Sequence, residues 1–189
     1  QGCGDFNPQV KVPLVLGRNG IREDQDQYSL GRGRQLMDIK YILPFLEALK
    51  GVLEQFGAVD IRRGDMARND LMYVDTDITA VVGMVGQVRG NIAYSMAEDT
   101  AKKIVSAMMM GMPVEELDEM GRSALGEFSN MVTGNASTLL SNSGVQVDIT
   151  PPSIIFGKDV YFIISSVETL KIDMETSLGK VEVNIGLEI

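Results

Sequence analysis

The sequence predicts an α+β fold in which a helix-plus-three-strands unit occurs twice, with an antiparallel sheet and long helices packed on one face. Three observations lead to this fold class. Apolar residues three and four positions apart indicate amphipathic helices, and short apolar runs joined by glycine-containing turns indicate antiparallel strands. The two halves of the chain can also be aligned with each other, which indicates a duplication. A sheet with its helices on one face accommodates all three.

The composition excludes several kinds of chemistry. The 189 residues include no His, so the chain has neither a Ser-His-Asp nor a Cys-His nucleophilic site, nor a metal site that uses imidazole. Any reaction must therefore use carboxylates, amides, hydroxyls or lysines. The formal net charge of −9 is unlike the basic surface of a protein that binds phosphate backbones, so we expect no nucleic acid partner.

Two further features of the composition bear on location. No run of about 18 apolar residues is present, so we expect no membrane-spanning segment and no membrane partner. A single Cys builds no intrachain disulfide framework, which is typical of a reducing cytoplasm. A hydrophobic fraction of 44% and a charged fraction of 23% are typical of a globular protein that buries a core.

The composition changes at Met37. Residues 1–36 contain no Met and hold the Cys, whereas all 12 Met lie from residue 37 onward. We interpret residues 1–36 as a leader, artificially added or flexible, and residues 37–189 as a single domain. The alternative is that Val12–Leu16 forms a short edge strand or an arm across a partner.

The first predicted helix extends from Asp38 to Phe56, with its regular part beginning near Pro44. Gly57 ends it, and a strand is expected at Ala58–Arg62. The runs Ile78–Met84 and Asn91–Met96 then flank a glycine-containing turn and predict a β-hairpin.

A second helix is expected at Glu98–Met109. Four Met lie at or beyond its end, and they suit either an adaptable binding surface or, as we prefer, the filling of the core; they are Met108, Met109, Met110 and Met112. A third helix follows at Gly121–Leu140 and ends at Asn142–Gly144. Strands are expected afterwards at Val145–Thr150, Ser153–Phe156, Val160–Ser166, Leu170–Met174 and Lys180–Leu187, the last a candidate edge strand that would pair with another protomer.

The internal alignment places Gly57 on Gly144, an offset of 87 residues. Later in each half, Gly90 and Gly179 occupy equivalent positions where a turn leads into a strand. The two halves therefore share the order of one long helix followed by strands.

The third helix has two contrasting faces. The face expected to be buried carries Leu125, Phe128, Val132, Ala136 and Leu139, and the opposite face carries Ser123, Glu127, Asn130, Gly134, Thr138 and Ser141. A solvated helix face normally holds many charged residues, yet this one has a single carboxylate. Asn and Gly also disfavour a helix, so they need another reason to be there. Either the face docks closely against a partner, or Gly134 lets another element of this chain pack on it.

The residues on this face resemble a known signature. Ser123, Glu127 and Asn130 are followed by Gly134-Asn-Ala136 and later by Asp148-Ile-Thr-Pro-Pro152, and together they resemble the pattern of the CheC/CheX family of chemotaxis phosphatases. The resemblance covers residues 37–189. One difference is that 21 residues separate Asn130 from Pro152, one fewer than in the family pattern, which we attribute to a shorter loop.

The duplication indicates which branch of the family is meant. Proteins of the CheC type carry a Glu-xx-Asn pair in both halves, and those of the CheX type carry one. With the offset of 87, Glu127 falls on Lys40 and Asn130 on Leu43, so the first half lacks the carboxylate and the amide. The sequence therefore resembles the CheX type, with a single site.

The resemblance implies a phosphatase that acts on the aspartyl phosphate of a CheY-like response regulator in the cytoplasm. Asn130 would hold the attacking water and Glu127 would bind a Lys of the regulator, as catalytic residues. Ser123, Gly134 and Thr138 would contact that partner. No cofactor is expected on this chain, because Mg²⁺ would belong to the regulator, and a homodimer is expected.

Two alternatives remain open. One is a non-catalytic module of the same fold that binds a partner through the third helix. The other is a carboxylate-based hydrolase, which would need a second carboxylate beside Glu127 in a concave pocket.

Overall fold

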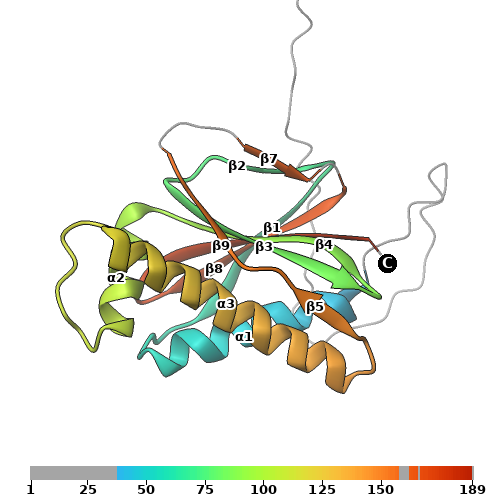
Figure 1. Cartoon of the computed structure of the whole chain (residues 1–189), viewed down its shortest axis with the longest axis horizontal. Helices are drawn as coiled ribbons and strands as arrows, with labels where there is room; N and C mark the ends of the chain where they lie inside the picture. Colours follow the sequence, from blue (N-terminus) through green and yellow to red (C-terminus); the bar gives the residue numbers. More distant parts are fainter. Residues whose placement is uncertain (1–37, 158–161, 166, 189) are drawn as a thin grey trace, which may run out of the picture. The chain divides into compact units, whose positions relative to one another are not determined.

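An antiparallel sheet lies at the centre of the chain, with α1 and α3 on one face and a two-stranded sheet on the other (Figure 1). The computed structural model describes residues 38–157, 162–165 and 167–188, so the prediction for residues 1–36, including the alternative strand at Val12–Leu16, lies outside the described residues. The helices are η1 (Ile39–Tyr41, a 3₁₀ turn), α1 (Leu43–Gln55), α2 (Glu98–Met108) and α3 (Glu119–Asn142).

The strands of the large sheet are ordered β1-β8-β9-β4-β3-β5, and β6 also pairs with β3. All of these pairings are antiparallel. The α+β fold class predicted from the sequence is therefore confirmed. The strands are β1 (Arg62–Asn69), β2 (Met72–Val74), β3 (Ile78–Gly86), β4 (Arg89–Met96), β5 (Val147–Ile149), β6 (Ser153–Phe156), β7 (Phe162–Ser165), β8 (Thr169–Thr176) and β9 (Gly179–Glu188).

The duplication is visible in the order of the strands. If β1, β3 and β4 are exchanged with β5, β8 and β9, the order β1-β8-β9-β4-β3-β5 is reproduced in reverse. The aligned glycines share their backbone conformation, because φ is +81° at Gly57 and +87° at Gly144, and +148° at Gly90 and +131° at Gly179. Such positive values favour Gly, which explains why these residues recur at equivalent points.

The two faces of the sheet contact different layers, because side chains alternate along a strand. On β4, Ile92 and Tyr94 belong to the main core beneath the helices, whereas Ala93 packs with Met72 and Val74 of β2 on the other face. The helix α1 contributes six buried residues to the main core, and its Pro44, which is also buried, lies in the first turn, as the sequence predicts.

Two expectations about strands need correction, and one strand was not expected. The strand after α1 is Arg62–Asn69 and not Ala58–Arg62, because this edge strand is almost entirely exposed and lacks an apolar pattern. The short strand β2 was not predicted. The last strand does not lie at an edge: β9 runs between β8 and β4, with Val181 to Leu187 all buried, so it cannot pair with another protomer.

The remaining elements follow the predictions closely. The hairpin is formed by β3 and β4, which pair from Ile78 with Met96 to Met84 with Gly90. The helices α2 and α3 begin and end within two residues of their predicted bounds. The predicted strand Val160–Ser166 is described only as β7, Phe162–Ser165, since both of its outer ends lie beyond the described ranges. Within those ranges, no helix has the length and apolar character that crossing a membrane requires.

Candidate functional site

The helix α3 carries every predicted site residue, and local interactions define both of its ends. Asp118 caps the N-terminus, because its carboxylate accepts a hydrogen bond from the backbone N–H of Gly121 at 2.9 Å. Glu119 in the first turn interacts favourably with the positive end of the helix dipole. At the other end, Gly144 adopts φ +87°, as is common just beyond a helix.

One face of α3 packs on the sheet and on α1 much as predicted. Four of the five expected core residues are fully or almost fully buried, namely Leu125, Phe128, Val132 and Ala136. The fifth, Leu139, is only half-buried, and its neighbour Leu140 is buried instead. The stripe therefore turns slightly around the helix toward its C-terminus, since 3.6 residues per turn do not match a repeat of seven.

The opposite face of α3 is open. Ser123, Glu127, Asn130 and Thr138 are exposed and Gly134 is half-buried. A Cβ atom added to Gly134 would meet no atom within 4 Å, so within the described residues no other element packs there. No described element therefore supports the interpretation that Gly134 accommodates a neighbouring element of the same chain.

The two predicted catalytic side chains lie side by side, and no described residue binds either of them. Glu127 and Asn130 are three positions apart, so they project from the same face of α3. Among the described residues, neither side chain forms a hydrogen bond or an ion pair. Thr138 differs, because its hydroxyl donates to the carbonyl oxygen of Gly134 at 3.0 Å. The face thus offers one free carboxylate and one free amide.

The proline segment lies beside this face. Thr150 is hydrogen-bonded to Gly83 of β3 twice: its N–H donates to the Gly83 carbonyl and its hydroxyl accepts from the Gly83 N–H, both at 2.9 Å. These bonds fix the chain just before the two prolines. The ring of Pro152 then lies close to Gly126: a Cβ atom added to this glycine would be 3.8 Å from the ring. Pro152 therefore contacts the turn of α3 that also carries Glu127 and Asn130.

Two exposed residues near the start of α3 were not predicted as part of the site. Met120 lies three positions before Ser123 on the same face, and 61% of its surface is exposed. The Arg122 guanidinium lies 4.8 Å from the ring centre of Phe156 in β6. Helical spacing indicates the position of Met120, but nothing in the sequence connects Arg122 with Phe156.

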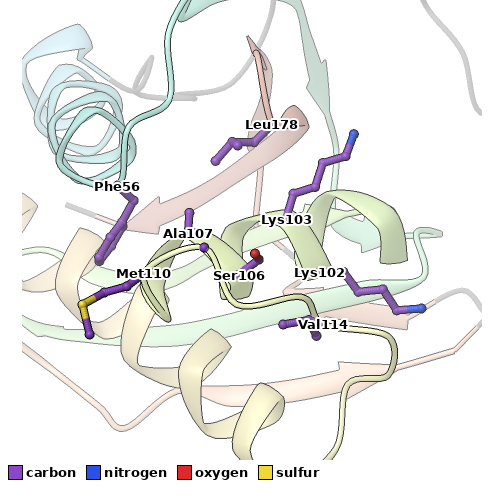
Figure 2. Close-up of a pocket in the computed structure, with 9 residues that line it drawn as sticks. Phe56, Lys102, Lys103, Ser106, Ala107, Met110, Val114 and Leu178 are labelled. Atoms are coloured by element: carbon purple, nitrogen blue, oxygen red, sulfur yellow. The ribbon is translucent and has the colours of Figure 1, made fainter.

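A hollow of about 610 Å³ lies elsewhere, between the end of α1, α2 and the turn from β8 to β9 (Figure 2). Phe56, Met110 and Leu178 line it together with Lys102 and Lys103, and no predicted site residue does. Lys102 is paired with Glu98 at 2.8 Å, and this hydrogen bond raises the pKa of Lys102. The predicted site is thus an exposed helix face and not a cavity.

The four Met at the end of α2 divide into two pairs. Met108 and Met109 are half-buried and pack against the core, as the preferred interpretation requires. Met110 and Met112 are 98% and 54% exposed, so core filling does not explain them. Among the described residues, no group of three or more His, Cys, Asp or Glu side chains is arranged to hold a metal ion.

The first half has no corresponding face. Lys40, the counterpart of Glu127, lies in the 3₁₀ turn η1 and pairs with Asp38 at 3.3 Å. That hydrogen bond raises the pKa of Lys40, which therefore stays cationic. Leu43, the counterpart of Asn130, is the first residue of α1. Among the described helices, a Glu and an Asn three positions apart therefore occur only in α3.

Comparisons with known proteins show which family this chain is similar to. Residues 78–175 match the family described as chemotaxis phosphatase CheX. A relative from Thermotoga maritima, the CheY-P phosphatase CheX, is 32% identical over 124 residues, which cover 66% of this chain and 80% of the relative.

Solved structures share the fold. A CheC-like superfamily protein from Shewanella sp. PV-4 matches with a TM-score of 0.73 and 27% identity, over 81% of this chain and all of that one. A complex of CheX with CheY, BeF₃ and Mg²⁺ from Borrelia burgdorferi matches with a TM-score of 0.63 and 29% identity, over 80% of this chain and 100% of that chain. The matched family region contains Glu127, Asn130 and Pro152.

Proposed function

The chain belongs to the family of CheX chemotaxis phosphatases, and we propose that it accelerates hydrolysis of the aspartyl phosphate of a CheY-like response regulator. One observation carries the proposal: Glu127 and Asn130 project, unpaired and exposed, from a face of α3 that no described element covers. The Thermotoga relative is a phosphatase of CheY-P, and the Borrelia relative forms a complex with CheY, which supports this choice of substrate.

The chemistry requires little covalent participation by the protein. Phosphoryl transfer depends mainly on the position of the attacking water and on stabilisation of charge. The Asn130 amide both donates and accepts hydrogen bonds, so it can hold a water in line with the phosphorus atom. Glu127 binds the Lys of the regulator that contacts the phosphate, through a charge-assisted hydrogen bond, and so fixes the docked orientation.

The rest of the face serves as the contact surface. The absence of a side chain at Gly134 allows the backbone of the partner to approach α3 closely. Ser123 and Thr138, one or two turns away, present short polar side chains that do not obstruct docking. Mg²⁺ belongs to the regulator in this proposal, and the protein acts in the cytoplasm as a homodimer that does not use β9 for its interface.

The test is a phosphatase assay with a purified CheY-like regulator phosphorylated by a small phosphodonor. We expect the wild-type chain to accelerate phosphate release and Asn130→Ala to lower kcat by about 100-fold, because the water loses its orienting group. Asn142→Ala is the matched control, since Asn142 is also exposed on α3 but is its last residue and lies outside the signature. Equal losses in the two variants would contradict the mechanism.

A different outcome would favour the non-catalytic alternative. If the wild-type chain binds phosphorylated regulators without accelerating the loss of phosphate from any of them, the protein is a binding module. In that case Glu127→Ala would still weaken binding, whereas Asn130→Ala would not change a rate that is already uncatalysed.

A further inference from the structure

Three hydroxyl groups are buried together where α3 packs on β4. The side chains of Tyr94, Ser129 and Thr133 are all completely buried. The other α3 side chains on this contact are apolar, and Ser and Thr are weaker helix formers than Leu or Ala. Hydrophobic packing alone therefore does not explain why hydroxyls occupy these positions.

The direction of the hydrogen bonds follows from counting protons. The Thr133 hydroxyl donates its single proton to the carbonyl oxygen of Ser129 at 2.9 Å. It must then accept from the Tyr94 hydroxyl, which lies 2.9 Å away. Burial raises the pKa of Tyr94 well above its ordinary value, so this phenol remains a donor across the physiological range. A continuous chain thus runs from the sheet through Thr133 to the backbone of α3.

The second hydroxyl acts on the turn that carries the site. Ser129 donates to the carbonyl oxygens of Leu125 and Gly126, both at 2.9 Å. In an α-helix, the Gly126 carbonyl is also the acceptor for the backbone N–H of Asn130. The Ser129 hydroxyl therefore shares an acceptor with Asn130, and side-chain bonds of this kind bend a helix locally.

The same turn is held on its flank. Pro152 lies against Gly126, 3.8 Å from the position of a Cβ, and Gly126 directly precedes Glu127. The turn is thus fixed by Pro152 at its side and by the hydroxyl chain from within, while its outer face stays open. An open face has no contacts of its own with which to orient its side chains, so its geometry depends on this internal support.

We propose that Ser129 and Thr133, the latter anchored by Tyr94, are positioning residues that set the local geometry of the Glu127–Asn130 turn for catalysis. The proposal rests on the proposed phosphatase function. It assigns the hydroxyl chain to the orientation of the site, beyond its contribution to packing. A residue that orients a catalytic group affects turnover more than binding, because small displacements of the attacking water are costly.

The chain offers a matched control at the other end of α3. Ser143 also donates from its hydroxyl to two carbonyls of α3, those of Leu139 and Leu140, at 3.3 and 2.8 Å. We expect Ser129→Ala to lower kcat by about fivefold to tenfold with KM unchanged, and Ser143→Ala to leave both constants unchanged. Thr133→Val should behave like Ser129→Ala, and Thr133→Ser, which keeps the hydroxyl, should restore kcat.

A measurement on the free protein separates this inference from the proposed function. Amide hydrogen exchange should change at Glu127 to Thr133 in Ser129→Ala, and only in the last turn of α3 in Ser143→Ala, because each hydroxyl acts on the carbonyls of its own turn. Equal losses of kcat in the two Ser variants, or no rescue by Thr133→Ser, would overturn the positioning role. If the wild-type chain is not a phosphatase, the catalytic role fails with the proposed function. Exchange that is unchanged in Ser129→Ala would then separately overturn the claim that the Ser129 hydroxyl sets the geometry of the turn, and exchange that changes only at that turn would support this claim.

Discussion

The two halves of the molecule share a scaffold but differ in the helix that leads each of them. The last residue of α1, Gln55, and the last residue of α3, Asn142, are separated by the same 87 residues as Gly57 and Gly144. The helices therefore end at equivalent points. They begin at different points, because α3 has 24 residues and α1 has 13.

This difference in length determines where a site can form. The extra residues of α3 lie at its N-terminal end, which carries Ser123 and Glu127. In the first half, the corresponding region includes the 3₁₀ turn η1 at Ile39–Tyr41, and the counterpart of Ser123 lies outside the described residues. Duplication thus accounts for the sheet and its two covering helices, whereas the candidate site depends on features of the second half alone.

The largest expected effect comes from replacing Glu127 by lysine, the residue at the aligned position of the first half. Glu127→Lys replaces the carboxylate by the Lys found at position 40 and sets a cation against the cation expected on the regulator. We expect kcat/KM to fall by about 100-fold or more in the phosphatase assay, since attraction becomes repulsion at a docked interface. Glu127→Gln, which removes the charge without reversing it, should cause a smaller loss.

Glu47→Lys is the control for Glu127→Lys. It changes the net charge equally, and Glu47 is exposed on α1 at the position equivalent to Gly134. A similar loss of kcat/KM in both variants would show that overall charge, and not the α3 face, governs the encounter with the regulator.

The sequence predicted best those elements whose pattern is local. The apolar spacing of α1 and α3 was sufficient to predict these helices, and the turn glycines were sufficient to predict the β3–β4 hairpin. The edge strand β1 was misplaced because its residues are charged and exposed on both faces. The central place of β9 depends on its pairing with β4 and β8. The pattern of residues within β9 does not reveal which strands it pairs with.

The candidate site shows the same division between local and distant information. Helical spacing was enough to place Glu127 and Asn130 on one face, and an exposed face is what the structure has. The contact of Pro152 with Gly126 and the bond from Tyr94 to Thr133 join segments 26 and 39 residues apart. Such contacts depend on how the sheet and α3 pack, so the sequence alone did not predict them.

A smaller effect, on the free energy of unfolding, tests whether the two halves are equivalent at the aligned glycines that follow their helices. Gly57 and Gly144 have nearly equal positive φ angles, and a Cβ on either would meet no atom within 4 Å. Replacement by Ala should therefore cost only the backbone strain of a left-handed conformation, about 1 kcal/mol of unfolding free energy at each site. Urea denaturation measures this value.

The control for the two glycine variants lies within α1. Gly51 has no positive φ and equally open surroundings, so Gly51→Ala should increase the unfolding free energy by up to about 1 kcal/mol through helix propensity. If Gly57→Ala and Gly144→Ala differ from each other by as much as either differs from the wild type, the two helix ends are not equivalent.

The smallest expected effect comes from moving the site residues to the first half. Lys40→Glu combined with Leu43→Asn, made in a chain whose own site is inactivated by Asn130→Ala, should restore no phosphatase activity. The new carboxylate would lie in η1, where three residues complete a turn, and the new amide would lie on the first residue of α1. Neither has the buried hydroxyls or the Pro152 contact that support the turn in α3. Circular dichroism would verify folding, and any restored acceleration would show that the two residue types suffice without the supporting turn.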